Sequence, residues 1–325
     1  MIALEHNSDA GECTRAESDT RAFQLVAPGS GAILIEVMIY GQYVSDLRSL
    51  VIVGSVDYPM PPSELFCDLM WDSGLQVIFI RRPGFGNSRE LPSVLLRESE
   101  ISNGAAVTTE AALLLKTLNK LQLKNLILIG LGTSNPVCLR LAKLSSEIEL
   151  LICANPVFNQ QILEVFKPVW FRTLLELILK TRTGVKMAEV ALKHQLRKDP
   201  MKFYQDVLEK SPGDWQYAQD NNADLLEACR LLLKVSPETF AYDVRMSLLP
   251  DSTLQDDFFS DLNAVILSGQ ETSDEWKRQL NKEAQRLGLQ CTYAPSGDML
   301  VPYVSPESLL DLIQSRLTES KRSPR

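Results

Sequence analysis

The stretch Lys124–Lys143 constrains the fold of this chain more than any other. An apolar run from Leu126 to Ile129 leads into a turn of small residues, and a helical pattern follows. A short apolar run that ends in a glycine-containing turn before a helix is typical of a buried strand that feeds a helix. The sequence therefore predicts an α/β fold organised around this turn.

The middle position of that turn holds a residue without a side chain. Strand, tight turn and helix in this order form the layout of a nucleophile elbow, which reads Gly-x-Ser-x-Gly with the nucleophile in the middle. Laid over this sequence, the outer positions are Gly130 and Ser134, and the middle position is Gly132. Thr133 and Ser134 remain as shifted nucleophiles, although we expect Ser134 to satisfy a free amide at the helix start.

Composition excludes several classes of protein. The chain has 325 residues and a net charge of -8, which argues against a nucleic-acid partner. No apolar run reaches the ~18 residues needed to span a bilayer, and no secretory signal is visible. The scattered cysteines, without a Cys-x-x-Cys pair, fit a reducing cytoplasm. With only His6 and His194 present, a multi-histidine metal site is excluded.

Alternating apolar runs and helical patterns predict the elements of the fold. A hairpin that turns at residues 28–31 comes first, and a buried strand begins at Ser49. Further strands are predicted at Gln76–Ile80, Leu126–Ile129, Glu149–Ala154, Leu262–Leu267 and Leu289–Tyr293. Helices are predicted at Glu64–Ser73, Thr108–Leu121, Asp274–Leu287 and Pro306–Leu317. This order implies a mostly parallel sheet of about eight strands, covered on both faces.

The segments of the chain differ in character. Residues 1–20 are predicted to be a disordered leader, and residues 318–325 a basic tail. Residues 21–157 and 251–317 form the predicted α/β core. Between them, residues 158–250 contain amphipathic helices and no strand-like run. A helical insertion in an α/β chain is typical of a cap over the strand ends, where such folds bind ligands.

Four stretches of the sequence resemble motifs of the α/β-hydrolase superfamily, and the resemblance covers roughly residues 21–317. The most specific is Val77–Ser88, which is similar to the family's Asp-x-Arg-Gly-x-Gly-x-Ser loop in an Arg-Pro-Gly-Phe-Gly form. The other three are the strand and oxyanion-type loop Val51–Ser55, the elbow Leu128–Ser134, and Ala294–Asp298, which resembles the terminal Gly-His loop. The resemblance implies an α/β-hydrolase fold with an inserted helical cap.

The resemblance places substituted residues at all three triad positions. Gly132 stands at the nucleophile, Thr272 at the acid and Asp298 at the histidine; Glu271 and Asp274 are neighbours of Thr272. Serine hydrolysis needs a hydroxyl, a base and an orienting acid. A carboxylate with a pKa near ~3.9 barely activates a hydroxyl. The sequence therefore predicts a hydrolase-like pseudoenzyme and not a serine hydrolase.

The predicted function is binding. We expect a non-catalytic homologue that binds a small, partly apolar ligand or a protein partner through the pocket between sheet and cap. The predicted pocket residues follow strand ends and are Ser55, Val56, Gly132, Thr133 and Asp298. The amides of Val56 and Thr133 could hold an anion or a carbonyl, because an oxyanion hole needs no side chain. We predict no cofactor and no metal.

Two other functions stay open. The first is an active hydrolase or lyase that uses Asp298 with water, Glu271 or Asp274. The second is an interaction scaffold, or a homodimer, in which the cap with Trp170, Phe171 and Trp215 contacts the partner. A pocket between Gly132, Asp298 and the cap would favour ligand binding, whereas a filled centre would favour the scaffold.

Other polar side chains near these motifs are predicted to be structural. We expect His194 to be solvated on a charged cap helix, and Arg81 and Arg82 to hold their loop through hydrogen bonds and ion pairs. Glycine at position 132 relieves the backbone strain, ~1–3 kcal/mol, that an elbow nucleophile usually carries. Replacing Gly132 with Ser should therefore destabilise the fold.

Overall fold

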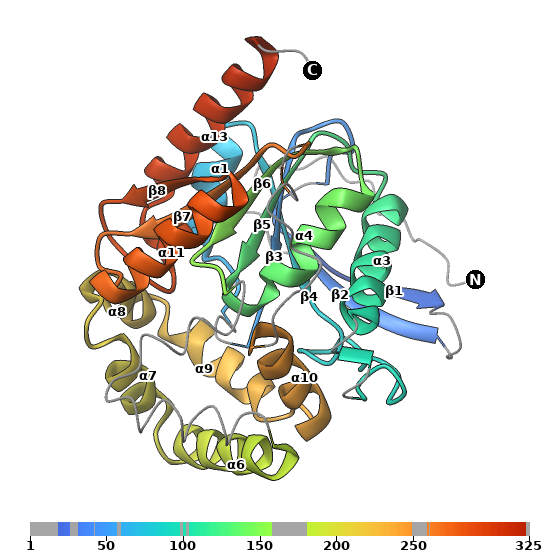
Figure 1. The fold of residues 1–325 in the computed structure, drawn as a ribbon, viewed down its shortest axis with the longest axis vertical. Helices are drawn as coiled ribbons and strands as arrows, with labels where there is room; N and C mark the ends of the chain where they lie inside the picture. Colours follow the sequence, from blue (N-terminus) through green and yellow to red (C-terminus); the bar gives the residue numbers. More distant parts are fainter. Residues whose placement is uncertain are drawn as a thin grey trace, which may run out of the picture.

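The structure, a computed structural model, has an eight-stranded sheet at its centre (Figure 1). It describes residues 19–26, 32–41, 43–56, 60–97, 100–101, 104–157, 181–248, 259 and 261–322. The strands are β1 (Asp19–Val26), β2 (Ala32–Ile39), β3 (Ser49–Val53), β4 (Gln76–Arg81), β5 (Leu126–Leu131), β6 (Ile148–Ala154), β7 (Ala264–Gly269) and β8 (Gln290–Ala294). Their order in the sheet is β1-β2-β4-β3-β5-β6-β7-β8.

The sheet is mostly parallel, as predicted. The first two strands form an antiparallel hairpin, and β2 is also antiparallel to β4. All other neighbouring strands are parallel. Every residue of the central strands β3, β4, β5 and β7 is buried. Continuous apolar runs are typical of parallel strands that are covered on both faces.

Helices cover both faces of the sheet (Figure 1). On one face lie α3 (Ala105–Lys120), α4 (Asn135–Leu144) and α11 (Asp274–Leu287). On the other lie α1 (Glu64–Asp72) and α13 (Pro306–Arg322). Each face has its own hydrophobic cluster, so the sheet is the middle of three layers. This arrangement leaves the strand ends, and not the sheet faces, available for a functional site.

Five described helices lie between β6 and β7 in the sequence. They are α6 (Arg182–Lys198), α7 (Pro200–Leu208), α8 (Pro212–Asp220), α9 (Asn222–Leu232) and α10 (Pro237–Leu248). These inserted helices form a third hydrophobic cluster of their own. They lie together beyond one end of the sheet in Figure 1, and α10 contacts the turn that follows β5.

Some predicted boundaries differ from the structure. β1 begins at Asp19, inside the predicted leader, and α13 continues to Arg322, inside the predicted tail. That helix continues because no glycine or proline interrupts it before Pro324. Gly130 belongs to β5 and not to the turn. Trp170 and Phe171 lie outside the described residues. No helix among the described residues is long and apolar enough to cross a membrane.

Candidate functional site

The turn after β5 has a backbone conformation that favours glycine. A short 3-10 helix, η1 (Gly132–Ser134), follows directly on Leu131. Gly132 has φ of +43°, in the left-handed region where a side chain costs roughly 1–2 kcal/mol. The amide group of Asn135 donates a hydrogen bond of 2.8 Å to the Gly132 carbonyl. The sharp turn of an elbow is therefore present, although its nucleophile is not.

Ser134 has a structural role in this turn. Its hydroxyl accepts a hydrogen bond from the amide of Leu131 at 2.8 Å and donates one to the carbonyl of Val53 at 3.0 Å. The side chain is buried and joins the end of β5 to the end of β3. The prediction that Ser134 satisfies a free amide at the helix start is therefore wrong. Its hydroxyl faces the sheet and satisfies the amide of Leu131, at the end of the strand.

Thr133, which follows Gly132, is bound to the inserted helices. Its hydroxyl donates a hydrogen bond of 2.7 Å to Oδ2 of Asp243, which lies on α10. The side chain of Thr133 is buried. A residue predicted to contact a ligand thus has a protein carboxylate as its hydrogen-bond partner, and the elbow is attached to α10 through that contact.

Asp243 belongs to a buried ion network centred on Arg82. The guanidinium pairs with Asp243 through Nη1, and it donates to both oxygens of Glu110 at 2.6 and 3.2 Å. The Tyr242 hydroxyl also donates to Glu110, at 2.7 Å. Burial alone would lower the pKa of Arg82, but Glu110 and Asp243 raise it well above its usual value. The predicted structural role of Arg82 is confirmed, and its network joins β4, α3 and α10.

The residues at the acid and histidine positions of the triad contact each other. The Thr272 hydroxyl donates a hydrogen bond of 2.7 Å to Oδ1 of Asp298, and Asn155 Nδ2 donates to the same oxygen at 2.6 Å. Asn155 Oδ1 in turn accepts from Ser268 and Trp276, each at 3.0 Å. Burial raises the pKa of Asp298, although the bonds from Thr272 and Asn155 act to lower it. Thr272 and Asp298, which the resemblance assigns to the acid and histidine positions, are therefore joined by a hydrogen bond.

Asn155 and Asp214 were not predicted from the sequence as residues of the site. Asn155 follows β6 directly and has φ of +41°. The pair Asn-Pro after a buried strand is the sequence pattern that could have indicated this residue. Asp214, on α8, accepts hydrogen bonds of 3.1, 2.6 and 3.1 Å from the amides of Asp298, Met299 and Leu300. Burial raises the pKa of Asp214 to about 6 despite these bonds. It lies 84 residues from Asp298 in the sequence, so no local pattern predicts the contact.

The two acidic neighbours of Thr272 have different surroundings. The carboxylate of Glu271 accepts from the hydroxyls of Ser211 and Ser296 at 2.6 and 2.7 Å and from the amide of Gly213 at 3.0 Å. Burial acts to raise the pKa of Glu271, but the hydrogen bonds from these groups outweigh it and lower the pKa. The side chain of Asp274 is 91% exposed. Glu271 therefore joins α8 to the sheet, and Asp274 faces solvent.

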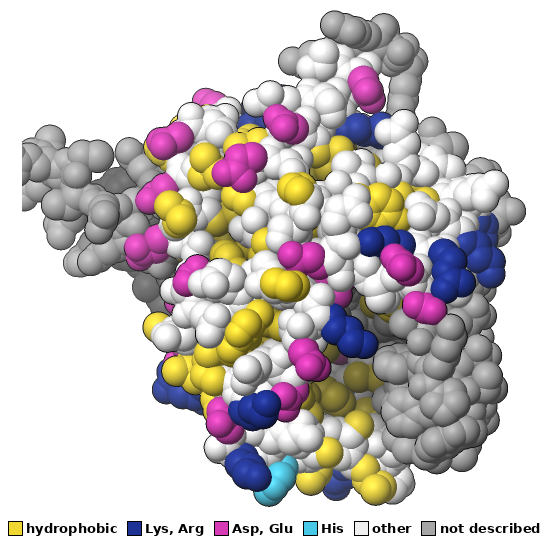
Figure 2. Space-filling model, turned by 90° about the vertical axis from the view of Figure 1, so that its left-hand side faces the viewer, with side chains coloured by type: hydrophobic (Ala, Val, Ile, Leu, Met, Phe, Trp, Pro, Cys, Tyr) yellow, Lys and Arg dark blue, Asp and Glu magenta, His cyan; other side chains and the backbone are white. Residues whose placement is uncertain are grey.

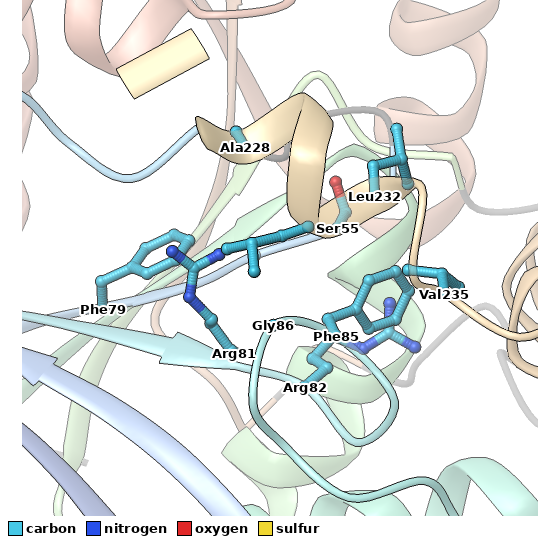
Figure 3. A pocket seen from close by; sticks show the side chains of 11 residues that line it. Ser55, Phe79, Arg81, Arg82, Phe85, Gly86, Ala228, Leu232 and Val235 are labelled. Carbon is cyan, nitrogen blue, oxygen red and sulfur yellow. The ribbon is translucent and has the colours of Figure 1, made fainter. Parts of the chain in front are cut away.

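Ser55 lies in a small cavity between the sheet and α9 (Figure 3). The described lining residues are Gly54, Ser55, Phe79, Arg81, Arg82, Phe85, Gly86, Ala228, Leu231, Leu232 and Val235. The cavity volume is about 20 Å³, enough for about one water molecule. Ser55 Oγ has no hydrogen-bond partner among the described residues. Arg81, also at the cavity, pairs with Glu36 at 3.4 Å.

The predicted pocket residues thus lie in separate environments. Val56 packs against the cluster of the inserted helices, and none of Gly132, Thr133 or Asp298 lines the cavity beside Ser55. Pairing of the Val56 and Thr133 amides stays a prediction. His194 is exposed on α6, as predicted. Among the described residues, no group of three or more His, Cys, Asp or Glu side chains could hold a metal ion.

Comparisons with known proteins match the chain only at the level of structure. No protein-family model matches the sequence, and no curated protein matches it. A probable hydrolytic enzyme from Pseudomonas aeruginosa superposes with a TM-score of 0.61 and 13% identity, covering 92% of this chain and 94% of the other. An esterase from Exiguobacterium antarcticum has a TM-score of 0.58 and 15% identity, covering 91% and 98%.

An epoxide hydrolase from Acinetobacter nosocomialis is similar to the same extent. Its TM-score is 0.61 at 13% identity, and the superposition covers 92% of this chain and 89% of the other. These superpositions extend over nearly the whole length of both chains, and the predicted sheet and helices agree with them. The chain therefore has the α/β-hydrolase fold.

Proposed function

We propose that this chain is a non-catalytic homologue of the α/β-hydrolases that works by binding. The observation that carries the proposal is the hydrogen bond of 2.7 Å between Thr272 and Asp298, in a chain whose elbow has Gly132 as its central residue. The residues that the resemblance assigns to the triad supply no hydroxyl at the central elbow position, Gly132, and no imidazole to activate one. His194, on α6, is exposed.

The inserted helices are proposed to be the cap and the binding surface. The exposed fractions of Met187 and Val190 are 67% and 59%, and residues three apart share one face of a helix. Val207 and Leu226, on α7 and α9, are 44% exposed. Figure 2 shows hydrophobic side chains gathered toward this end of the molecule. The cavity beside Ser55 is about 20 Å³, so a protein partner has more support than a small ligand in that cavity.

One observation favours a second candidate function, an enzyme with altered chemistry. Burial raises the pKa of Asp298, and a carboxylate with a higher pKa is a better base for a water molecule. Glu271 has less support because hydrogen bonds lower its pKa, and Asp274 has less because its side chain is 91% exposed. A substitution of Asp298 can therefore distinguish the non-catalytic function from the enzymatic one.

Turnover of p-nitrophenyl esters by the pure full-length chain separates them. We expect no hydrolysis above the buffer rate, because the elbow lacks a nucleophile and Asp298 already accepts bonds from Thr272 and Asn155. Asp298→Asn is the matched variant, since it keeps the shape of the side chain and removes its basicity. Hydrolysis by the wild type that disappears in Asp298→Asn would overturn the non-catalytic proposal.

Gly132→Ser restores a hydroxyl at the nucleophile position, and we expect it to lower stability without creating activity. The φ of +43° at this residue makes any side chain cost about 1–2 kcal/mol. Urea denaturation measures that loss. Gly74→Ser is the reference for backbone strain alone, because Gly74 has φ of +77° and no atom within 4 Å of an added Cβ, and it should lose a similar amount. A Gly132→Ser chain as stable as the wild type, or active on esters, contradicts the expectation.

A further inference from the structure

A large groove lies outside the catalytic positions, between α6, α10 and the segment before α3. Its volume is about 850 Å³, within the range of about 300–1,000 Å³ that is usual for small-molecule sites. The described residues that line it are Ser93, Leu96, Arg97, Thr183, Lys186, Pro237, Glu238, Ala241 and Arg245. None of the triad positions and none of the residues around Ser55 is among them, so the groove is a separate feature.

The charge of this groove is opposite to that of the chain. Among the described lining residues, Arg97, Lys186 and Arg245 contribute three positive charges and Glu238 one negative charge, which leaves two positive charges. The whole chain has a net charge of -8. Within the described part of the molecule, the side chains of the three basic residues make no hydrogen bond or ion pair with a protein group. Three cations that line one groove, and that have no carboxylate partner among the described residues, attract an anion from solution.

The walls of the groove are held by packing. Val185 on α6 and Phe240 on α10 belong to the same hydrophobic cluster and are 1% and 8% exposed. Each is adjacent in sequence to a groove residue, Lys186 or Ala241. Figure 1 shows α6 and α10 next to each other at this end of the molecule, and the two helices are in contact. Lys186 and Arg245 lie on these two packed helices, so their backbone positions are fixed relative to each other before a ligand arrives, which lowers the entropic cost of binding.

We propose that this groove binds a phosphate monoester whose remaining part is apolar. A phosphate monoester carries about 1.5–2 negative charges at neutral pH, which matches the two positive charges of the groove. The guanidinium groups of Arg97 and Arg245 have the planar donors that suit phosphate oxygens. Leu96, Pro237 and Ala241 supply apolar wall for the rest of the ligand. The inference does not depend on the absence of catalysis.

Calorimetric titration of the full-length chain with phenyl phosphate tests the proposal. We expect saturable binding that weakens as salt is added, because exposed charges are screened. The double variant Arg97→Gln/Arg245→Gln should bind about tenfold more weakly or worse, since it removes two of the three cations and their charge-assisted hydrogen bonds to the phosphate. Lys198→Gln, at the far end of α6 and outside the groove, is the matched control and should bind as the wild type does.

Three results would overturn the proposal. The first is that the chain does not bind phenyl phosphate at millimolar concentration. The second is that the wild type and the double variant bind it with equal affinity. The third is that Lys198→Gln weakens binding as much as the double variant does. Benzoate, a monoanion with the same ring, should bind more weakly than phenyl phosphate; equal affinity would contradict the match to a dianion. Melting temperatures of all variants show that each is folded. The ester assay above is independent, so failure of either proposal leaves the other in place.

Discussion

Replacing Arg82 with Met is expected to lower the free energy of unfolding by about 3–5 kcal/mol, because it leaves buried carboxylates without their partner. Arg82 and Asp243 have fully buried side chains, and that of Glu110 is 1% exposed. The network also carries the contact from Asp243 to Thr133, so the loss should loosen α10 from the elbow. Urea denaturation followed by circular dichroism measures the change.

Arg48→Met is the matched control for this prediction. Arg48 pairs with Glu149 at 2.9 Å, but the side chains are 31% and 33% exposed, and such pairs contribute at most about 1 kcal/mol. The triple variant Arg82→Met/Glu110→Gln/Asp243→Asn should recover part of the loss, because no buried charge is left unpaired. Equal losses in Arg82→Met and Arg48→Met would show that the network does not hold the inserted helices to the core.

Replacing Gly269 with Ala is expected to lower the free energy of unfolding by about 3 kcal/mol, at the upper end of overpacking effects. A Cβ atom on Gly269 would lie 1.7 Å from the carbonyl oxygen of Gly297. Backbone atoms cannot rotate away as a side chain does, so the loop of Asp298 must shift. This close approach brings Thr272 to Asp298, and therefore the candidate site depends on glycine at 269.

Gly288→Ala separates this clash from the general effect of replacing a glycine. Gly288 has φ of +68° and no atom within 4 Å of an added Cβ, so only backbone strain of about 1 kcal/mol is expected. Both variants are measured by the midpoint of urea denaturation. If Gly269→Ala is no less stable than Gly288→Ala, the contact between the two loops is not as tight as the structure shows.

Local patterns predicted most of the fold. The helix Asp274–Leu287 was predicted with the bounds that α11 has, because Ser273 precedes an acidic first turn and Gly288 ends the helix. Gly288 indeed has a left-handed conformation, and the Ser273 hydroxyl accepts from the amide of Trp276. The prediction of α3 began three residues late, at Thr108, because its first turn is capped by Gly104 without a side-chain hydrogen bond.

The candidate site was predictable only where short motifs mark its positions. Gly132, Thr272 and Asp298 each follow a strand end closely, and the resemblance to the α/β-hydrolase motifs assigned them to the three triad positions. The partners of these residues were not predictable. Asp243 lies 110 residues from Thr133, and Asp214 lies 84 residues from Asp298.

The sequence alone determined the sheet, the layers and the substitution of the triad residues. Hydrophobic periodicity and turn residues act over a few positions, so they can be recognised without knowing the fold. Only the tertiary structure decided how the elbow is attached to the inserted helices through Thr133, Asp243 and Arg82. Those contacts depend on side-chain packing between elements far apart in sequence, and burial then sets the pKa values of Asp214 and Asp298.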